Sequence, residues 1–296
     1  MKLTKVNSTV GPVNGTRAKP CVLELRFDTR VSCINCHLLN HITAFAATAM
    51  PVNYLRGFAS TERTDSTNRR LGCWLAFVAG AANAGGFLAV GQYTSHMSGI
   101  VSSVADNLAL GDIGIVTAGF SSLAAFLVGA ATSAILINWG RRRRAHSVYA
   151  TPLMLEAILL LCFGLLGSNL ENHRLLFVPV TVVLLCFVMG LQNAMITKIS
   201  RSEIRTTHVT GLVTDMGIEI GKMIYWNSDA PGMASVRADW PKLALLGLLL
   251  GMFFLGGLAG ALGFKHLGFV STVPLAVILL TLAAVPVLDD ILGRQH

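Results

Sequence analysis

Six long runs of apolar residues, separated by shorter polar stretches, dominate the chain after residue 70. A helix needs about 20 apolar residues to cross a bilayer, and each run is close to that length. The pattern therefore predicts an all-α fold, a polytopic membrane protein with six transmembrane helices. The predicted spans are residues 71–91, 113–139, 150–168, 175–195, 243–263 and 268–288.

Two further stretches, residues 94–111 and 206–222, are too polar and too short to cross a membrane on their own. If both crossed, the chain would have eight spans, and the basic clusters at 69–70 and 141–144 would lie on opposite sides. Lysine and arginine gather on the cytoplasmic side of membrane proteins. We therefore predict that both stretches are polar half-helices, re-entrant or interfacial, and that both termini are cytoplasmic.

The composition agrees with a membrane protein. Charged residues make up 13% of the chain and the mean hydropathy is +0.62, whereas a soluble domain carries about twice that share of charge. The net charge is +8, but the basic residues lie mainly in the loops between apolar runs. That placement is typical of topology signals and not of nucleic-acid binding. The lipid bilayer is the expected partner, and a homo-oligomer is left open.

Residues 1–70 lack sustained periodicity, and we expect a largely disordered cytoplasmic tail. An alternative is that Met50 is the natural start, so that residues 1–49 do not belong to the protein. The tail contains Cys33, Cys36 and His37 in the spacing of a covalent haem site. Haem attachment takes place outside the cytoplasm, and a zinc site needs more ligands than one Cys pair supplies. We predict no cofactor and no metal.

The apolar part of the chain is written twice. Four segments of the first half recur in the same order in the second, namely residues 77–84 with 187–194, 94–99 with 206–211, 126–129 with 254–257, and 152–153 with 274–275. Each repeat, residues 71–168 and residues 175–288, then holds three spans and one half-helix. Because three is odd, the second repeat must be inverted in the membrane. Inverted repeats are common among transporters, with a site at the repeat interface.

Polar residues at equivalent positions of the two repeats mark the predicted solute site. Each first span carries an asparagine near its end, and each half-helix opens with Thr-x-His-x-Ser/Thr-Gly. A helix that restarts inside the membrane directs free N–H groups and its positive end at a ligand. The predicted binding residues are Asn83, Thr94, His96, Ser98, Asn193, Thr206, His208 and Thr210. The alternative is that the histidines satisfy broken helix ends and the asparagines join helices.

Four acidic residues are the candidates for proton or ion coupling, since ionisable groups at membrane depth are costly. They are Asp106, Glu156, Asp215 and Glu219. Glu156 stands in an otherwise apolar span, and its equivalent in the second repeat is Ile278. The alternatives are that Glu156 reaches the membrane surface, and that Asp215, Glu219 and Lys222 form a solvated helix face.

Residues 77–111 include Asn-Ala-Gly-Gly-Phe at 83–87 and Gln-Tyr-Thr-Ser-His-Met-Ser-Gly at 92–99. This stretch resembles the YoaK-like family of bacterial membrane proteins, also known as domain of unknown function 1275. The resemblance extends over about residues 70–288 and implies a bacterial inner-membrane protein of about six spans. It implies no substrate, cofactor or mechanism.

Together these features predict a transporter of a small solute or ion, with proton coupling as one version and the substrate unknown. The competing hypothesis is a non-transporting membrane scaffold or partner subunit. We do not expect an enzyme, because the spans contain no metal-ligand cluster, nucleophile elbow or phosphate loop.

Overall fold

The computed structural model describes residues 65–143, 148–167, 174–200, 204–227 and 235–291, all within the compact unit Thr48–His296. These residues form α-helices and one short 3-10 helix, with no strand among them. In chain order the elements are α3 (Asp65–Val90), α4 (Met97–Leu110), α5 (Ile113–Arg142), α6 (Ala150–Gly167), α7 (Arg174–Ile199), α8 (Val209–Ile224), α9 (Trp240–Leu267), η1 (Gly268–Ser271) and α10 (Thr272–Ile291). The Cys-x-x-Cys-His motif of the tail lies outside the described residues.

Five segments of the described chain are long and apolar enough to cross a membrane. Four of them lie in the single helices α3, α5, α6 and α7. The fifth, Trp240–Ala284, contains α9, η1 and most of α10. The short helices α4 and α8 are not among the five. The prediction of an all-helical fold is therefore confirmed for the described residues, and the five apolar segments agree with a multi-pass membrane protein.

Glycines with a positive φ end two of the helices, and aspartate caps begin two others. Gly91 follows α3 and Gly111 follows α4, with φ angles of 73° and 80° that residues with a side chain rarely adopt. Asp112 caps α5 and Asp239 caps α9, and each carboxylate accepts a hydrogen bond from the backbone N–H three residues later. Such a cap stabilises a helix by about 1 kcal/mol. The two aspartates therefore begin equivalent helices in the two repeats.

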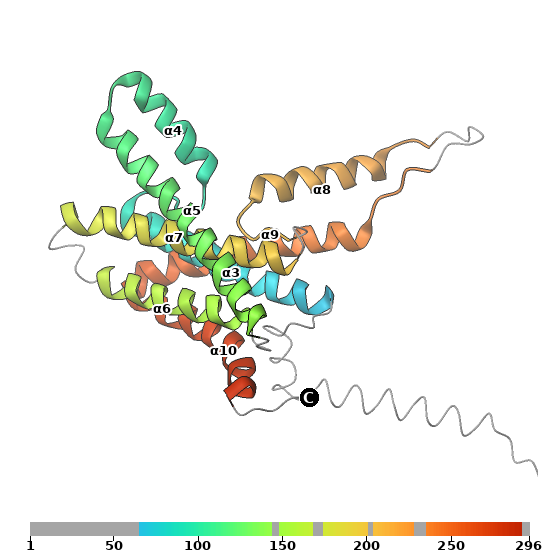
Figure 1. The fold of residues 1–296 in the computed structure, drawn as a ribbon. Coiled ribbons are helices and arrows are strands. Elements are labelled where there is room, and N and C mark those ends of the chain that lie inside the picture. Colours follow the sequence, from blue (N-terminus) through green and yellow to red (C-terminus); the bar gives the residue numbers. More distant parts are fainter. Residues whose placement is uncertain (1–64, 144–147, 168–173, 201–203, 228–234, 292–296) are drawn as a thin grey trace, which may run out of the picture. The chain divides into compact units, whose positions relative to one another are not determined.

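A short and a long helix pack together in each repeat. α4 packs against α5, and α8 packs against α9, so that each pair forms a hairpin (Figure 1). In the first repeat only Gly111 and Asp112 separate the two helices, whereas residues 225–239 separate them in the second. The longer connection of the second repeat therefore leaves the hairpin intact.

The first helix of one repeat packs against the long helix of the other. In the pair α3 and α9, Gly72 lies beside Leu249 and Gly85 lies beside Phe264. Residue numbers rise together along both helices, so α3 and α9 are parallel.

The pair α5 and α7 repeats this arrangement. Gly190 of α7 lies against Phe126 of α5. Further along both helices, the ammonium of Lys198 donates a hydrogen bond to Oδ1 of Asn138 at 3.2 Å. These contacts make α5 and α7 parallel as well.

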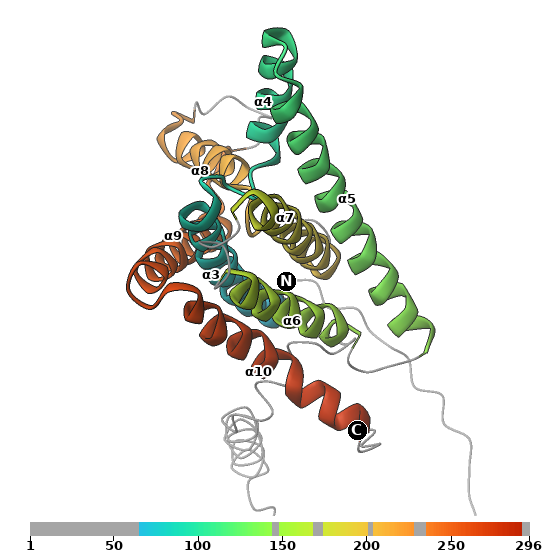
Figure 2. The same cartoon turned by 90° about the vertical axis from the view of Figure 1, so that its left-hand side faces the viewer.

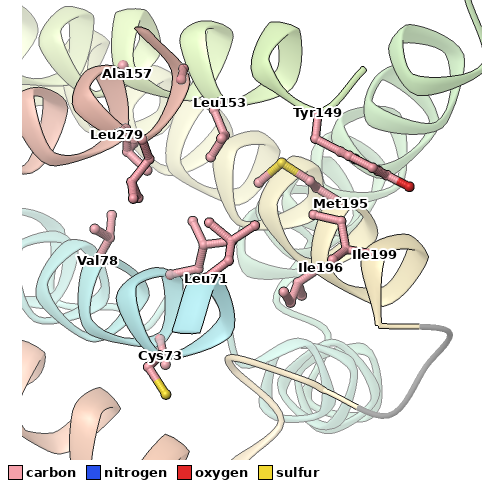
Figure 3. Packing of buried hydrophobic residues seen from close by; sticks show 14 of the residues in the cluster. Leu71, Cys73, Val78, Tyr149, Leu153, Ala157, Met195, Ile196, Ile199 and Leu279 are labelled. Carbon is pink, nitrogen blue, oxygen red and sulfur yellow. The ribbon is translucent and has the colours of Figure 1, made fainter. Parts of the chain in front are cut away.

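The third pairing joins the last helices of the two repeats. α6 and α10 lie side by side in both views (Figure 2). Gly164, near the end of α6, lies beside Thr272 at the start of α10. Ala157 and Leu279, each further from those ends, face one another in the core (Figure 3). α6 and α10 are therefore antiparallel.

Both parallel pairs cross through the same Phe-x-x-Gly motif. A methyl group on any of four glycines would overlap the backbone carbonyl of a phenylalanine in the facing helix. The four contacts are Gly80 with Phe253, Gly256 with Phe77, Gly190 with Phe126, and Gly129 with Phe187. The contacts are reciprocal within each pair, since each helix supplies one glycine and one carbonyl. Small residues at such crossings let membrane helices approach closely.

These crossings correct the predicted register of the third repeat match. The sequence comparison aligned residues 126–129 with 254–257, which is wrong by one residue. Gly129 and Gly256 take the same place against the facing carbonyl, and Phe126 and Phe253 are equivalent. The caps at Asp112 and Asp239 share this spacing of 127 residues.

The main buried cluster joins helices of both repeats. Figure 3 shows side chains from α3, α6, α7 and α10 that point toward one another, among them Leu71, Leu153, Met195 and Leu279. A buried hydrogen bond crosses the same region, because Nε2 of Gln192 in α7 donates to the carbonyl of Leu75 in α3 at 3.0 Å. The repeats are therefore intertwined, and neither has a core of its own.

Candidate functional site

The half-helices α4 and α8 begin in the same way. His96 and His208 are their N-cap residues, with similar backbone angles and no side-chain capping hydrogen bond. Each imidazole lies over the glycine three residues later, so that a Cβ on Gly99 would be 2.6 Å from Nδ1 of His96. Gly211 stands in the same relation to His208. The Thr-x-His-x-Ser/Thr-Gly motif therefore places a histidine over the open first turn of each half-helix.

An asparagine holds each break in place. In the first repeat, the backbone N–H and the hydroxyl of Ser95 donate to Oδ1 of Asn83, at 3.3 and 3.0 Å. In the second, the hydroxyl of Thr207 donates to Oδ1 of Asn193 at 2.7 Å. The two asparagines join the segment before each half-helix to the preceding span, which agrees with the hydrogen-bonding role weighed for them.

The two breaks border one cavity of about 730 Å³. Its lining residues come from α3, α4, α5, α7, α8 and α9 and from the segments that precede the half-helices. They are Asn83, Tyr93, Ser95, His96, Met97, Ser98 and Phe126 from the first repeat, and Asn193, Thr207, His208, Val209, Thr210 and Phe253 from the second. All except Tyr93 form equivalent pairs in the corrected register. The cavity therefore lies where the two repeats meet, and it brings together six of the eight predicted binding residues.

Thr94 and Thr206 are the two predicted binding residues that do not line the cavity. Both are fully buried, and within the described residues neither hydroxyl has a hydrogen-bond partner. Oγ1 of Thr94 faces α3, where it would lie 3.6 Å from a Cβ on Gly86. Their burial follows from the fold of the segment, because residues 93–100 and 205–212 share the same succession of buried and exposed positions.

The predicted coupling residues do not gather at this cavity. Asp106 is exposed on α4. Asp215 is half-buried and lines a neighbouring pocket of about 380 Å³ together with Arg205 and His208. Arg205 lies within 3.3 Å of Nδ1 of His208 through its guanidinium. Of the three acidic residues on the half-helices, Asp215 is therefore the one that adjoins the site.

Glu219 joins α8 to the beginning of α9. Its buried carboxylate accepts a hydrogen bond of 2.9 Å from the backbone N–H of Asp239 and another of 2.9 Å from Lys222, and Lys242 lies 3.6 Å away. The backbone N–H of Asp239, followed by Lys222, lowers the pKa of this carboxyl below its ordinary value. The expectation of a solvated face is therefore wrong for Glu219, whose carboxylate binds across the hairpin.

Glu156 occupies a different place in the protein. Its side chain is fully buried in α6, and within the described structure neither carboxylate oxygen has a hydrogen-bond partner. The alternative that it reaches the membrane surface is therefore wrong. A buried charge without a partner is very costly, which makes Glu156 a candidate for function.

The sequence did not single out several residues beside the cavity. Phe126 and Phe253 line it from the two helix crossings, and their signal was the recurring Phe-x-x-Gly motif. Tyr93 also lines the cavity and stacks on Phe87, with ring centroids 4.6 Å apart. Its equivalent in the second repeat is Arg205, so the symmetry of the site is broken at this position.

Comparison with known proteins identifies the family of this chain but no individual relative. A family model described as protein of unknown function (DUF1275) matches residues 71–285. No curated protein matches the chain, and no solved structure matches it. The matched region runs from α3 into α10 and contains all the cavity residues.

Proposed function

The chain belongs to the DUF1275 family of proteins of unknown function, and we propose that it is a membrane transporter for a small solute. The observation that carries this proposal is the shared cavity. Six pairs of equivalent residues from two repeats surround one space of about 730 Å³, bordered by two broken helices. Secondary transporters built from repeats bind their substrates at such an interface, near helix breaks.

The directions of the packed helices support six spans in two inverted repeats. With six spans, α6 and α10 are the third and sixth crossings and must be antiparallel. If α4 and α8 also crossed, α6 and α10 would be the fourth and eighth crossings, and these two helices would have to be parallel. The contact of Gly164 with Thr272 places the end of α6 beside the start of α10. It therefore favours six spans, with α4 and α8 as half-helices.

The tryptophans support one orientation for this arrangement. The chain has four, namely Trp74, Trp139, Trp226 and Trp240, and all are at least partly exposed. In the six-span arrangement they lie near the same side of the membrane as the basic clusters at 69–70 and 141–143. Tryptophan prefers the membrane interface, and basic residues prefer the cytoplasmic side. These preferences support a protein of the bacterial inner membrane with both termini in the cytoplasm.

Proton coupling is part of the proposal and rests on Glu156. This carboxyl is buried and has no hydrogen-bond partner among the described residues, so a conformation that gives it a partner would stabilise its charged form. A group whose two protonation states favour two conformations can couple a proton to the movement of a solute. Glu156 has no acidic equivalent in the second repeat, where Ile278 takes its place.

The proposal is tested by flux through the full-length protein in proteoliposomes. Neutral, cationic and anionic metabolites are offered in turn, and we expect accumulation of at least one class above that in empty vesicles. His96→Ala combined with His208→Ala should abolish this flux. His266→Ala is the matched control, because His266 is exposed at the end of α9 and lies outside the cavity.

Absence of flux for every class would contradict a transport function. So would a double variant that transports as well as the control. If one stoichiometric partner protein is also captured by the inactive vesicle protein, the scaffold hypothesis takes the place of transport.

A further inference from the structure

We infer that the central cavity binds a small anion, a molecule that carries a carboxylate, phosphate or sulfate group. This inference deepens the proposed function and depends on the same cavity. It follows from which groups border the cavity and which groups are missing from its lining.

The lining contains no charged side chain of either sign within the described residues. A cation would therefore meet no carboxylate there. A neutral polar solute would need matched acceptors, but Oδ1 of Asn83 already accepts two hydrogen bonds from Ser95, and Oδ1 of Asn193 already accepts one from Thr207. The side-chain amide oxygens of the site therefore bind other parts of the protein.

The groups that remain can all donate a hydrogen bond. Ser98 and Thr210 line the cavity, and the described structure gives their hydroxyls no hydrogen bond. The first turns of α4 and α8 both begin at the cavity. Each helix start carries the equivalent of about half a positive charge, and the described structure gives no hydrogen bond to the backbone N–H groups of Ser98 and Gly99 in α4 or of Thr210 and Gly211 in α8. Two such ends that meet at one space favour negative charge more than either would alone.

Arg205 adds a full positive charge at the edge of the cavity. Its guanidinium lies 3.3 Å from Nδ1 of His208, a residue of the lining. A guanidinium can only donate, so Nδ1 must accept and the proton of the neutral ring is on Nε2. The contact therefore fixes His208 as a hydrogen-bond donor at its other nitrogen. The nearest acidic neighbour, Asp215, shares the adjoining pocket with Arg205 and forms no ion pair with it among the described residues.

The two sides of the cavity differ in charge, because one pair of equivalent positions holds different residues. Arg205 stands where the first repeat has Tyr93, which stacks on Phe87 and carries no charge. Among the described residues no guanidinium contacts the ring of His96, so the positive charge of Arg205 is on the His208 side of the cavity. We expect the acidic group of the ligand to bind on that side.

The test measures the thermal stability of the full-length protein in detergent with added sodium phosphate, sulfate, acetate and succinate. Sodium concentration and ionic strength are held constant, and glycerol and tetramethylammonium chloride serve as neutral and cationic probes. We expect a saturable increase in the unfolding midpoint with at least one of the anions. Arg205→Gln should weaken the apparent affinity roughly tenfold, as expected for the loss of one charge-assisted contact. Lys265→Gln is the matched control, since Lys265 is exposed at the end of α9 and outside the cavity lining.

Three results would overturn the inference. These are saturation by the neutral or cationic probe alone, no saturable effect from any of the four anions, and equal anion affinity in Arg205→Gln and Lys265→Gln. The proteoliposome experiment separates this inference from the proposed function. Anion binding without flux would remove the transport function and leave the anion site, whereas flux of neutral or cationic solutes alone would do the reverse.

Discussion

Gly80 of α3 lies directly against the backbone carbonyl of Phe253 in α9, with no space for a side chain between them. Phe253 also lines the central cavity, so this crossing is at once a packing contact and part of the site. The same relationship joins Gly190 of α7 and Phe126 of α5. The crossings of the two parallel helix pairs therefore border the cavity on both sides of the repeat interface.

Gly80→Ala should destabilise the protein, because the new methyl group meets backbone atoms that cannot rotate away. A Cβ there would lie 2.9 Å from the backbone nitrogen of Gly257 as well as on the Phe253 carbonyl. Overpacking of this kind costs about 1–3 kcal/mol. Thermal unfolding in detergent measures the effect. Gly247→Ala is the control, since nothing lies within 4 Å of a Cβ there, and equal stability of the two variants would contradict the crossing.

Gly99→Ala and Gly211→Ala should impair the site more than the fold. Each added methyl would displace the imidazole of His96 or His208, whose rings are flexible enough to move away. We expect uptake in proteoliposomes to fall about tenfold, as for a misplaced binding group, with little loss of thermal stability. Gly217→Ala on α8 has open space around its Cβ and should leave uptake unchanged. Undiminished uptake in both Gly99→Ala and Gly211→Ala would show that the imidazoles do not contribute to solute binding.

Glu156→Leu should stabilise the protein and remove its response to a proton gradient. The substitution replaces a buried, unpartnered carboxyl by an apolar side chain of similar size, as Ile278 provides in the second repeat. Relief of an unsatisfied buried polar group is worth about 1–3 kcal/mol. The unfolding midpoint and the pH-gradient dependence of uptake are measured together. Met154→Leu, on a half-exposed face of the same helix, is the control, and a lower midpoint for Glu156→Leu would mean that the carboxyl is satisfied.

Acid should loosen the α8–α9 hairpin through Glu219. Its pKa in the folded protein lies below the ordinary value of 4.5, because the N–H of Asp239 and Lys222 bind the charged form. The stabilisation is therefore fully present above about pH 4.5 and disappears as the pH falls through the lower folded value. Hydrogen exchange of the first turn of α9 measures it. Glu219→Gln should exchange faster than the natural protein at pH 7 and equally fast under strong acid; equal exchange at pH 7 would contradict the contact.

The sequence predicted the long apolar helices, the two short polar helices and the breaks before them, because apolar run length and repeated polar motifs are local signals. The sequence comparison matched residues 126–129 with 254–257, whereas the structure matches them with 253–256. The segment Phe253-Phe254-Leu255-Gly256-Gly257 offers two phenylalanines and two glycines, and only the facing carbonyl of Phe77 selects Gly256. The burial of Thr94 and Thr206 was also beyond the sequence, since it depends on how the segment folds back on α3.

Glu219 illustrates a further limit. The sequence offered it as a coupling residue, with a solvated helix face as the alternative, whereas its partners include Asp239 and Lys242 at the start of α9. This contact depends on where the start of α9 lies relative to α8. The length of the connection between the two helices does not determine that position. Conversely, Glu156 was singled out correctly as unusual, because a lone carboxylate in an apolar span is visible without knowledge of its neighbours.

The central claim is that two inverted repeats meet at one cavity, and labelling of single cysteines in whole cells tests it most directly. The six native cysteines are first replaced by serine or alanine, and one cysteine is then introduced at Leu110 or at Asn227, at the far ends of the two half-helices. Both positions are exposed. The inverted arrangement predicts that a membrane-impermeant maleimide labels Leu110→Cys from outside and labels Asn227→Cys only after the cells are opened. Labelling of both positions from the same side of the membrane would contradict it.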